Sequence, residues 1–135
     1  MNTYLILLSR ALVAAIFLCS GFGKIIGFQA MVAMARSAGL PLPAVAIGIA
    51  SAIEIAGGLA ILLGWQVRWA SLVLFLFLIP TTLVFHVAKM QTVEVLKNLA
   101  IMGGLLRFYI DASGDAARKD VASAPDVRAG WKKIE

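Results

Sequence analysis

Long apolar segments constrain the fold of this chain more than any other feature of its sequence. A helix that crosses the hydrocarbon core of a membrane needs about 20 mainly apolar residues. Hydrophobic residues make up 61% of the chain and charged residues only 14%, whereas soluble domains have roughly 45–50% apolar and about 25% charged residues. A water-soluble fold of 135 residues could not bury so much apolar surface. The sequence therefore predicts a membrane protein with spans at about residues 4–26, 43–64, 69–88 and 93–110.

The links between these segments predict how the spans are arranged. The second segment begins at Pro43 and ends at Gly64, and both residues are favoured at those ends of a helix. Residues 66–68 form a short link, which places successive helices side by side and antiparallel. We expect an all-α fold, namely a transmembrane antiparallel four-helix bundle with both termini on the same side of the membrane.

The end of the chain differs from the rest in composition. Residues 111–135 are polar and carry five basic and five acidic residues, so the net charge of +5 belongs to the apolar part. The sequence thus predicts a membrane domain over residues 1–110 and a flexible cytoplasmic tail over residues 111–135. The distribution of Lys and Arg slightly favours cytoplasmic termini. Because no cluster of basic residues is present, a nucleic-acid partner is not expected.

Glu54 is the most informative polar residue, because it lies near the middle of the second apolar segment. It is eleven residues beyond Pro43, about 16 Å along a helix, in a hydrocarbon core roughly 30 Å thick. Small residues share its helical face and direct it into the bundle. They are Ala50, Ser51, Gly57 and Gly58. An isolated carboxylate there is costly unless it is protonated or paired, so we expect either a buried ion pair that fixes packing or a site for a polar ligand or a proton.

Arg10 and Lys24 in the first segment are the candidate charge partners of Glu54. They are fourteen residues apart, close to four helical turns, and therefore share one face at opposite ends of the helix. Both side chains are long enough to reach inward. In the alternative interpretation, they simply extend to the two membrane surfaces.

A second group of polar residues is expected at one mouth of the bundle. His86, the only histidine, lies in the last turn of the third segment, and Lys97 and Asn98 open the fourth. In the predicted topology they lie on the same side as Lys24, with Glu54 below them. Such a pocket suits an anionic or quinone-like headgroup, whereas the simpler alternative is an ordinary basic rim.

Few residues are available for other chemistry. One cysteine, Cys19, and one histidine are too few for an intrachain disulfide or a closed metal site. A haem held by two histidines would need its second ligand from another chain. The glycines near Lys24 do not match a nucleotide-binding loop. The sequence therefore predicts no metal site and no cofactor of its own, with a quinone as the candidate ligand.

The polar and glycine positions together resemble the pattern of the DoxX family over about residues 8–108. The matching elements, in order, are Arg10, Ser20-Gly21, Lys24, Gly39-Leu40-Pro41, Glu54, Gly57-Gly58, Arg68, His86 and Lys97-Asn98. The resemblance implies a small four-helix protein of the bacterial inner membrane, similar to membrane oxidoreductases or their accessory subunits. The family takes its name from a subunit of a thiosulfate:quinone oxidoreductase, and some members are linked to stress from quinones, catechols or thiol oxidants.

Three functions are compatible with these residues and this resemblance. The first is a redox subunit that binds a quinone or quinol. In this function Glu54 and His86 exchange protons, and the electrons come from a partner subunit or from the ligand. The residues that would hold the headgroup or balance its charge are Arg10, Lys24, Lys97 and Asn98. The second is a non-catalytic structural membrane subunit. The third is a small transporter or resistance factor for a lipophilic compound. The expected partners are the lipid bilayer and either a redox subunit or a second copy of the chain.

Overall fold

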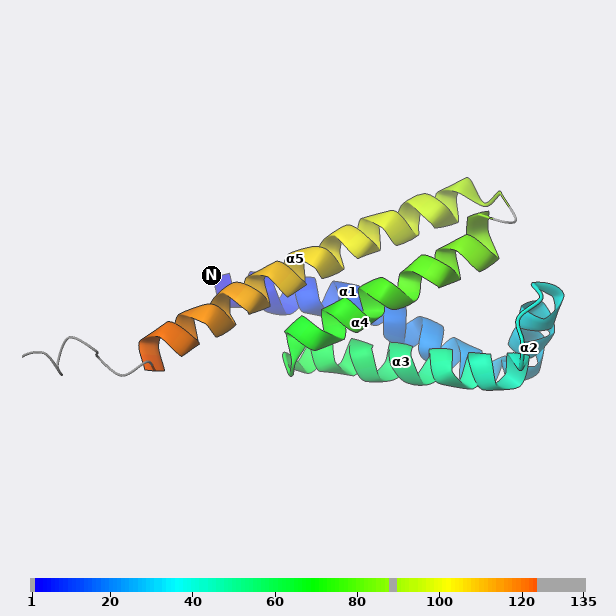
Figure 1. The fold of residues 1–135 in the computed structure, drawn as a ribbon, viewed down its shortest axis with the longest axis horizontal. Helices are drawn as coiled ribbons and strands as arrows, with labels where there is room; N and C mark the ends of the chain where they lie inside the picture. Colours follow the sequence, from blue (N-terminus) through cyan, green and yellow to red (C-terminus); the bar gives the residue numbers. More distant parts are fainter. Residues whose placement is uncertain (1, 88–89, 124–135) are drawn as a thin grey trace, which may run out of the picture.

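The computed structural model describes residues 2–87 and 90–123, and all regular structure in these residues is helical. The elements are α1 (Asn2–Ile26), α2 (Phe28–Ser37), α3 (Pro43–Leu63), α4 (Val67–Thr81), the π-helical segment η1 (Thr82–Val87) and α5 (Thr92–Ser123). The all-α prediction is confirmed. Figure 1 shows α1, α3, α4 and α5 running along the length of the molecule, with the short α2 at one end.

Three helical stretches are long and apolar enough to cross a membrane, namely Thr3–Ile26, Pro43–Leu63 and Val67–Phe85. They coincide with the first three predicted spans. The fourth predicted span lies inside α5, and no stretch of α5 within the described residues joins these three candidates. Charged residues near both ends of the predicted segment lower its apolar character.

The helix α5 continues beyond Ile110 to Ser123, whereas the sequence predicted the end of the helix near residue 110 and a flexible tail beyond it. Local contacts support the continuation. Arg107 Nη2 lies 3.0 Å from Asp111 Oδ1, one turn away, and such pairs stabilise helices. Residues 124–135 of the predicted tail lie outside the described residues.

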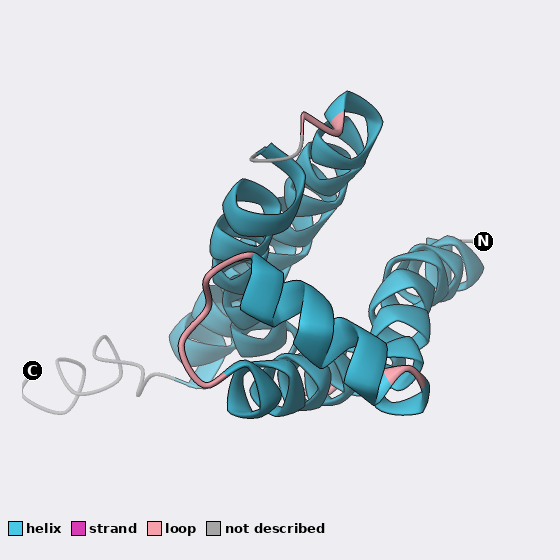
Figure 2. Ribbon diagram, turned by 90° about the vertical axis from the view of Figure 1, so that its right-hand side faces the viewer, coloured by secondary structure: helices cyan, strands magenta, loops and turns pink. Residues whose placement is uncertain are grey.

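The link between the first two spans contains the unpredicted helix α2. Gly27 separates it from α1, and Val32 and Ala35 on its inner face pack against Ile47 of α3. Gly39, Pro41 and Pro43 follow α2 and do not interrupt it. Figure 2, viewed toward this end of the molecule, shows α2 lying across the ends of the long helices.

The long helices form two closely packed pairs. The largest contacts join α1 to α3 and α4 to α5, α3 also packs against α4, and α1 touches α5 only slightly. Gly57 permits the close approach of α3 and α4, because a Cβ atom at this position would lie 2.7 Å from Leu74 Cγ. The buried core consists of Ala14, Phe17, Ile61, Leu74, Leu78 and Leu105.

The third span changes its helical geometry near its end. Pro80 lies inside α4, and the chain continues from Thr82 as the π-helical segment η1. Proline has no backbone N–H, so it removes one helical hydrogen bond. Single π-helical turns of this kind occur frequently at functional sites. The segment η1 contains the backbone of His86.

Candidate functional site

A cavity of about 600 Å³ lies between the helices at the end where α2 is found. Every helical element contributes to its wall, and most of the lining is apolar. The apolar residues include Phe17 of α1, Met31 of α2, Ile53 of α3, Leu78 of α4 and Ile101 of α5. The polar residues in the wall are Ser20, Lys24, Glu54, Thr81, Glu94, Lys97 and Asn98. The site is therefore a largely apolar cavity with a few localised polar groups.

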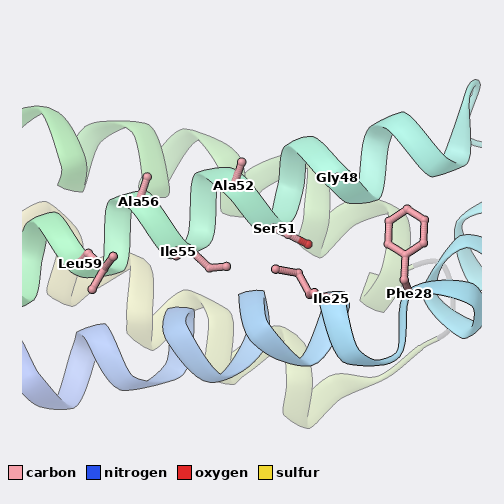
Figure 3. A pocket seen from close by; sticks show the side chains of 8 residues that line it. All are labelled: Ile25, Phe28, Gly48, Ser51, Ala52, Ile55, Ala56 and Leu59. Atoms are coloured by element: carbon pink, nitrogen blue, oxygen red, sulfur yellow. The ribbon is translucent and has the colours of Figure 1, made fainter.

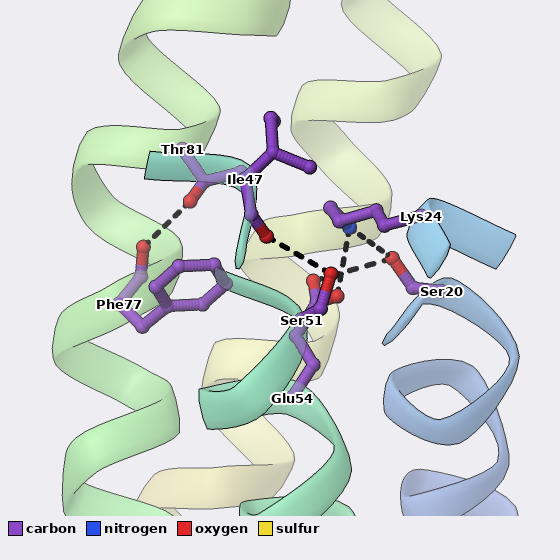
Figure 4. Close-up of polar contacts among 7 residues, drawn as sticks. All are labelled: Ser20, Lys24, Ile47, Ser51, Glu54, Phe77 and Thr81. Carbon is purple, nitrogen blue, oxygen red and sulfur yellow. Dashed lines mark hydrogen bonds and ion pairs between the residues drawn. The ribbon is translucent and has the colours of Figure 1, made fainter. Parts of the chain in front are cut away.

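Lys24 and Glu54 form an ion pair in this wall. Lys24 Nζ lies 2.7 Å from Glu54 Oε2, and the side chains are only 13% and 5% exposed. Ser20 joins the pair, because its hydroxyl accepts a hydrogen bond of 2.6 Å from Lys24 and donates one of 3.2 Å to Glu54 Oε1. Figure 4 shows the three side chains meeting between α1 and α3. We refer to Ser20, Lys24 and Glu54 as the polar cluster.

The local sequence explains why the polar cluster forms. Ser20 and Lys24 are four residues apart on α1, so they lie on the same face of the helix. Gly21 lies between them, and a Cβ atom there would be 2.7 Å from Ile55 Cγ1 and 3.3 Å from Glu54 Cβ. The absence of a side chain at Gly21 thus allows α1 to approach α3 closely enough for Lys24 to reach Glu54.

Two other hydroxyl groups near the cluster donate hydrogen bonds to backbone carbonyl oxygens. Ser51 donates a hydrogen bond of 2.9 Å to Ile47 O, and Thr81 donates one of 2.8 Å to Phe77 O (Figure 4). Both bonds run back one turn along the residue's own helix. These hydroxyls therefore satisfy their donors locally, and the polar cluster is the charged feature of this part of the wall.

A second polar contact, between η1 and α5, involves the lining residue Asn98. Asn98 Nδ2 donates a hydrogen bond of 2.9 Å to Thr82 Oγ1, and both residues are only 6% exposed. Lys97 pairs with Glu94 on its own helix, and both side chains of this pair are substantially exposed. Each cation in the cavity wall therefore has a carboxylate partner.

The structure brings Glu54, Lys24, Lys97 and Asn98 to one cavity, but Arg10 is elsewhere. The Arg10 guanidinium lies against Gly64 at the far end of α3, where a Cβ atom would be 2.5 Å from Nη1. The Arg10 side chain does not line the cavity. The side chain of His86 lies outside the described part of the structure, so its predicted role remains a prediction.

Two participants were not identified as site residues from the sequence. Ser20 was noted only within the family pattern, although its four-residue spacing from Lys24 could have indicated a contact. Thr82 pairs with Asn98 across sixteen residues. No local pattern predicts that contact, because it depends on how α4 and α5 pack.

A second, open groove of about 540 Å³ runs along α1 and α3 (Figure 3). Its lining is Ile25, Phe28, Gly48, Ser51, Ala52, Ile55, Ala56 and Leu59. No charged side chain contributes to it, and the Ser51 hydroxyl is bonded to Ile47 O. Within the described residues, no three His, Cys, Asp or Glu side chains are grouped as metal ligands would be.

These features define an all-helical membrane protein with a buried ion pair in the wall of an internal cavity. The chain belongs to the DoxX family, whose sequence profile matches residues 5–87. The resemblance found from the sequence is thereby confirmed, and the matched region includes the whole polar cluster. It ends before Lys97 and Asn98, which the resemblance had also included.

Two relatives from Escherichia coli (strain K12) are similar to most of the chain. Inner membrane protein YqjF is 32% identical over 115 residues, which cover 81% of this chain and 85% of the relative. Inner membrane protein YphA is 28% identical over 118 residues, which cover 82% and 84%. No solved structure matches the chain. Together with the three membrane-span candidates, these matches identify an integral inner-membrane protein.

Proposed function

We propose that this chain is a redox-related membrane subunit that binds a quinone or quinol headgroup in the 600 Å³ cavity. The observation that carries the proposal is the polar cluster, which places a carboxylate, an ammonium and a hydroxyl in an otherwise apolar wall. Ligand pockets for small molecules typically have volumes of about 300–1,000 Å³ and combine apolar walls with a few polar groups. The cavity fits this description in both size and composition.

The charge balance of the wall favours a neutral ligand. Lys24 is paired with Glu54, and Lys97 is paired with Glu94. An anionic headgroup, which the sequence had also suggested, would have to compete with a carboxylate for either ammonium. A neutral ring with carbonyl or hydroxyl groups can instead form hydrogen bonds with the cluster without separating the charges. A quinone or quinol has these properties.

The chemistry of the cluster suits proton exchange with such a ring. Reduction of a quinone to a quinol takes up two electrons and two protons. Lys24 can donate a hydrogen bond to a quinone oxygen, and Glu54 can accept the proton that a quinol hydroxyl releases, provided that they lie within hydrogen-bond reach. We assign the electrons to a redox partner protein. His86 remains the second proton-exchange candidate.

The proposed topology is a four-helix transmembrane bundle in which α5 supplies the fourth span and both termini are cytoplasmic. The arrangement of the helices supports it, since the start of α1 and the end of α5 lie at the same end of the molecule (Figure 1). The cavity also draws residues from α5, as expected if α5 packs at membrane depth.

A purely structural subunit is the second candidate function. The observation in its favour is that Ser20, Lys24 and Glu54 satisfy one another's hydrogen bonds. In that case the cluster holds α1 against α3, and the cavity has no specific ligand. A transporter or resistance factor for a lipophilic compound would bind in the same cavity without redox chemistry.

The test is to purify the full chain in mild detergent and to measure bound and added quinone. Ala46→Phe should abolish binding, because Ala46 lines the cavity and its replacement fills space without removing a member of the polar cluster. Glu54→Gln should weaken binding, and Val45→Phe, at an exposed neighbouring position, is the matched control. Quinone that neither co-purifies with the wild type nor binds on addition would rule out the leading proposal. Binding without any redox change in membranes containing the partner proteins would favour the transporter.

A further inference from the structure

The end of the molecule opposite the cavity contains arginines from three helices. Arg107 of α5 is paired with Asp111, but Arg10 of α1 and Arg68 of α4 have no carboxylate partner within residues 2–87 and 90–123. Both unpaired arginines lie at the turn between α3 and α4. Gly64, against which Arg10 rests, is the C-cap of α3, and Arg68 is the second residue of α4.

Arg68 is held between two aromatic rings with one donor unused. The centre of its guanidinium is 5.1 Å from the centroid of the Trp69 ring and 5.8 Å from that of Tyr109. Such contacts hold an arginine in place electrostatically without neutralising its charge. Arg68 Nε is buried and has no hydrogen-bond partner among the residues that the structure describes. A buried N–H donor normally has an acceptor, so Arg68 carries an unused donor beside a guanidinium whose charge is not neutralised by any described carboxylate.

Backbone groups at this turn add to the positive potential. Gln66, the N-cap of α4, has a left-handed backbone conformation with φ 47° and makes no capping hydrogen bond through its side chain. The first N–H groups of α4 therefore lack a side-chain cap, and a helix N-terminus attracts negative charge.

The surroundings of this turn are those of a membrane interface. Leu63, Trp65 and Trp69 are all exposed large side chains. Tryptophan is enriched at the level of the lipid headgroups, where its ring contacts both apolar and polar regions. A free anion in water would make no use of these exposed apolar groups, whereas the acyl chains of a lipid would cover them.

We propose that the α3–α4 turn is a binding site for the phosphate group of an anionic phospholipid, with Arg68 and Arg10 as its charged ligands. Guanidinium groups form paired, charge-assisted hydrogen bonds with phosphate oxygens. Arg68 supplies a fixed donor set, and Arg10 brings a second cation from α1. The lipid thereby links α1 to the α3–α4 turn. This site is separate from the cavity and does not depend on the function proposed for it.

The test is competitive lipid binding to the purified full chain, read by native mass spectrometry in detergent. Phosphatidylglycerol should be retained about tenfold better than phosphatidylcholine, because each arginine near the surface contributes to the attraction of an anionic headgroup. Arg68→Gln should remove most of this preference, and Arg68→Lys should retain part of it. Arg36→Gln is the matched control, since Arg36 is exposed on α2 at the other end of the molecule.

Several results would overturn the proposal. One is equal retention of the two lipids by the wild type, which does not depend on whether any variant folds. Another is an unchanged preference in a folded Arg68→Gln protein. Glycerol phosphate in solution is the control for a site that binds any phosphate. If it displaces phosphatidylglycerol at similar concentration, the lipid assignment is wrong.

Discussion

Lys24 and Glu54, thirty residues apart in the sequence, are joined by a contact of 2.7 Å between Nζ and Oε2. The two side chains lie on different helices, α1 and α3, and are almost completely removed from solvent. Each charge is acceptable in an apolar setting because the other is present. The contact therefore makes each residue dependent on its partner.

Removal of one member of this pair should destabilise the protein strongly. Lys24→Met leaves the buried Glu54 carboxylate without a cation, and such changes typically cost about 3–5 kcal/mol. Replacement of both residues by apolar ones, as in the double variant Lys24→Met with Glu54→Leu, should restore most of the stability. The free energy of unfolding in detergent measures both effects. A double variant less stable than Lys24→Met alone would contradict this account.

The exposed pair on α5 is the matched control for that experiment. Glu94 and Lys97 also form an ion pair, but both side chains remain accessible. Exposed pairs contribute about 0–1 kcal/mol, so Lys97→Met should change the unfolding free energy by no more than this. A loss as large as that from Lys24→Met would show that burial is not the deciding factor.

The close contact between α3 and α4 predicts a second result. Gly57→Ala places a methyl group 2.7 Å from Leu74 Cγ, and overpacking of this kind usually costs about 1–3 kcal/mol. Gly103→Ala on α5 is the control, because no described atom outside the local backbone of its own helix lies within 4 Å of the added Cβ. That change should be neutral or stabilising by up to about 1 kcal/mol, since alanine favours helix. Thermal unfolding of the two variants tests the difference, and equal losses would refute it.

The hydrogen bond between α5 and η1 predicts the effect of two further substitutions. Asn98→Ala removes the donor to Thr82 Oγ1 in a buried setting, which should cost about 1–3 kcal/mol. Combining it with Thr82→Val removes the unpaired hydroxyl and should recover part of the loss. A double-mutant cycle on unfolding free energies measures the coupling. Strict additivity of the two changes would argue against the hydrogen bond.

The sequence was sufficient to place Glu54 inside the protein but not to choose its partner. Depth along the helix and the small neighbouring residues indicated an inward carboxylate, and both Arg10 and Lys24 were on the right face of α1. The choice depends on Gly21, which brings α1 close to α3 one turn before Lys24. Arg10, about 21 Å away along the helix, meets the other end of α3. Which of the two cations pairs with Glu54 therefore depends on how α1 packs against α3, and the spacing of residues along α1 does not decide it.

Helix boundaries show the same limit. Pro43 and Gly64 marked the ends of α3 correctly, because each restricts the backbone at its own position. The helix α2 was missed because it is ten residues long and its inner face buries only Val32 and Ala35. The continuation of α5 to Ser123 was missed because a charged, alanine-rich segment reads equally well as a soluble tail.

The pairing of charges in the cavity wall has an electrical consequence. Among the described lining residues, Lys24, Glu54, Glu94 and Lys97 are the charged ones, and their formal charges cancel. A membrane potential acts on net charge, at about 2.3 kcal/mol per elementary charge for each 100 mV. A neutral molecule that enters or leaves this cavity moves no charge through the field. Its occupancy should therefore be the same in energised and de-energised membranes.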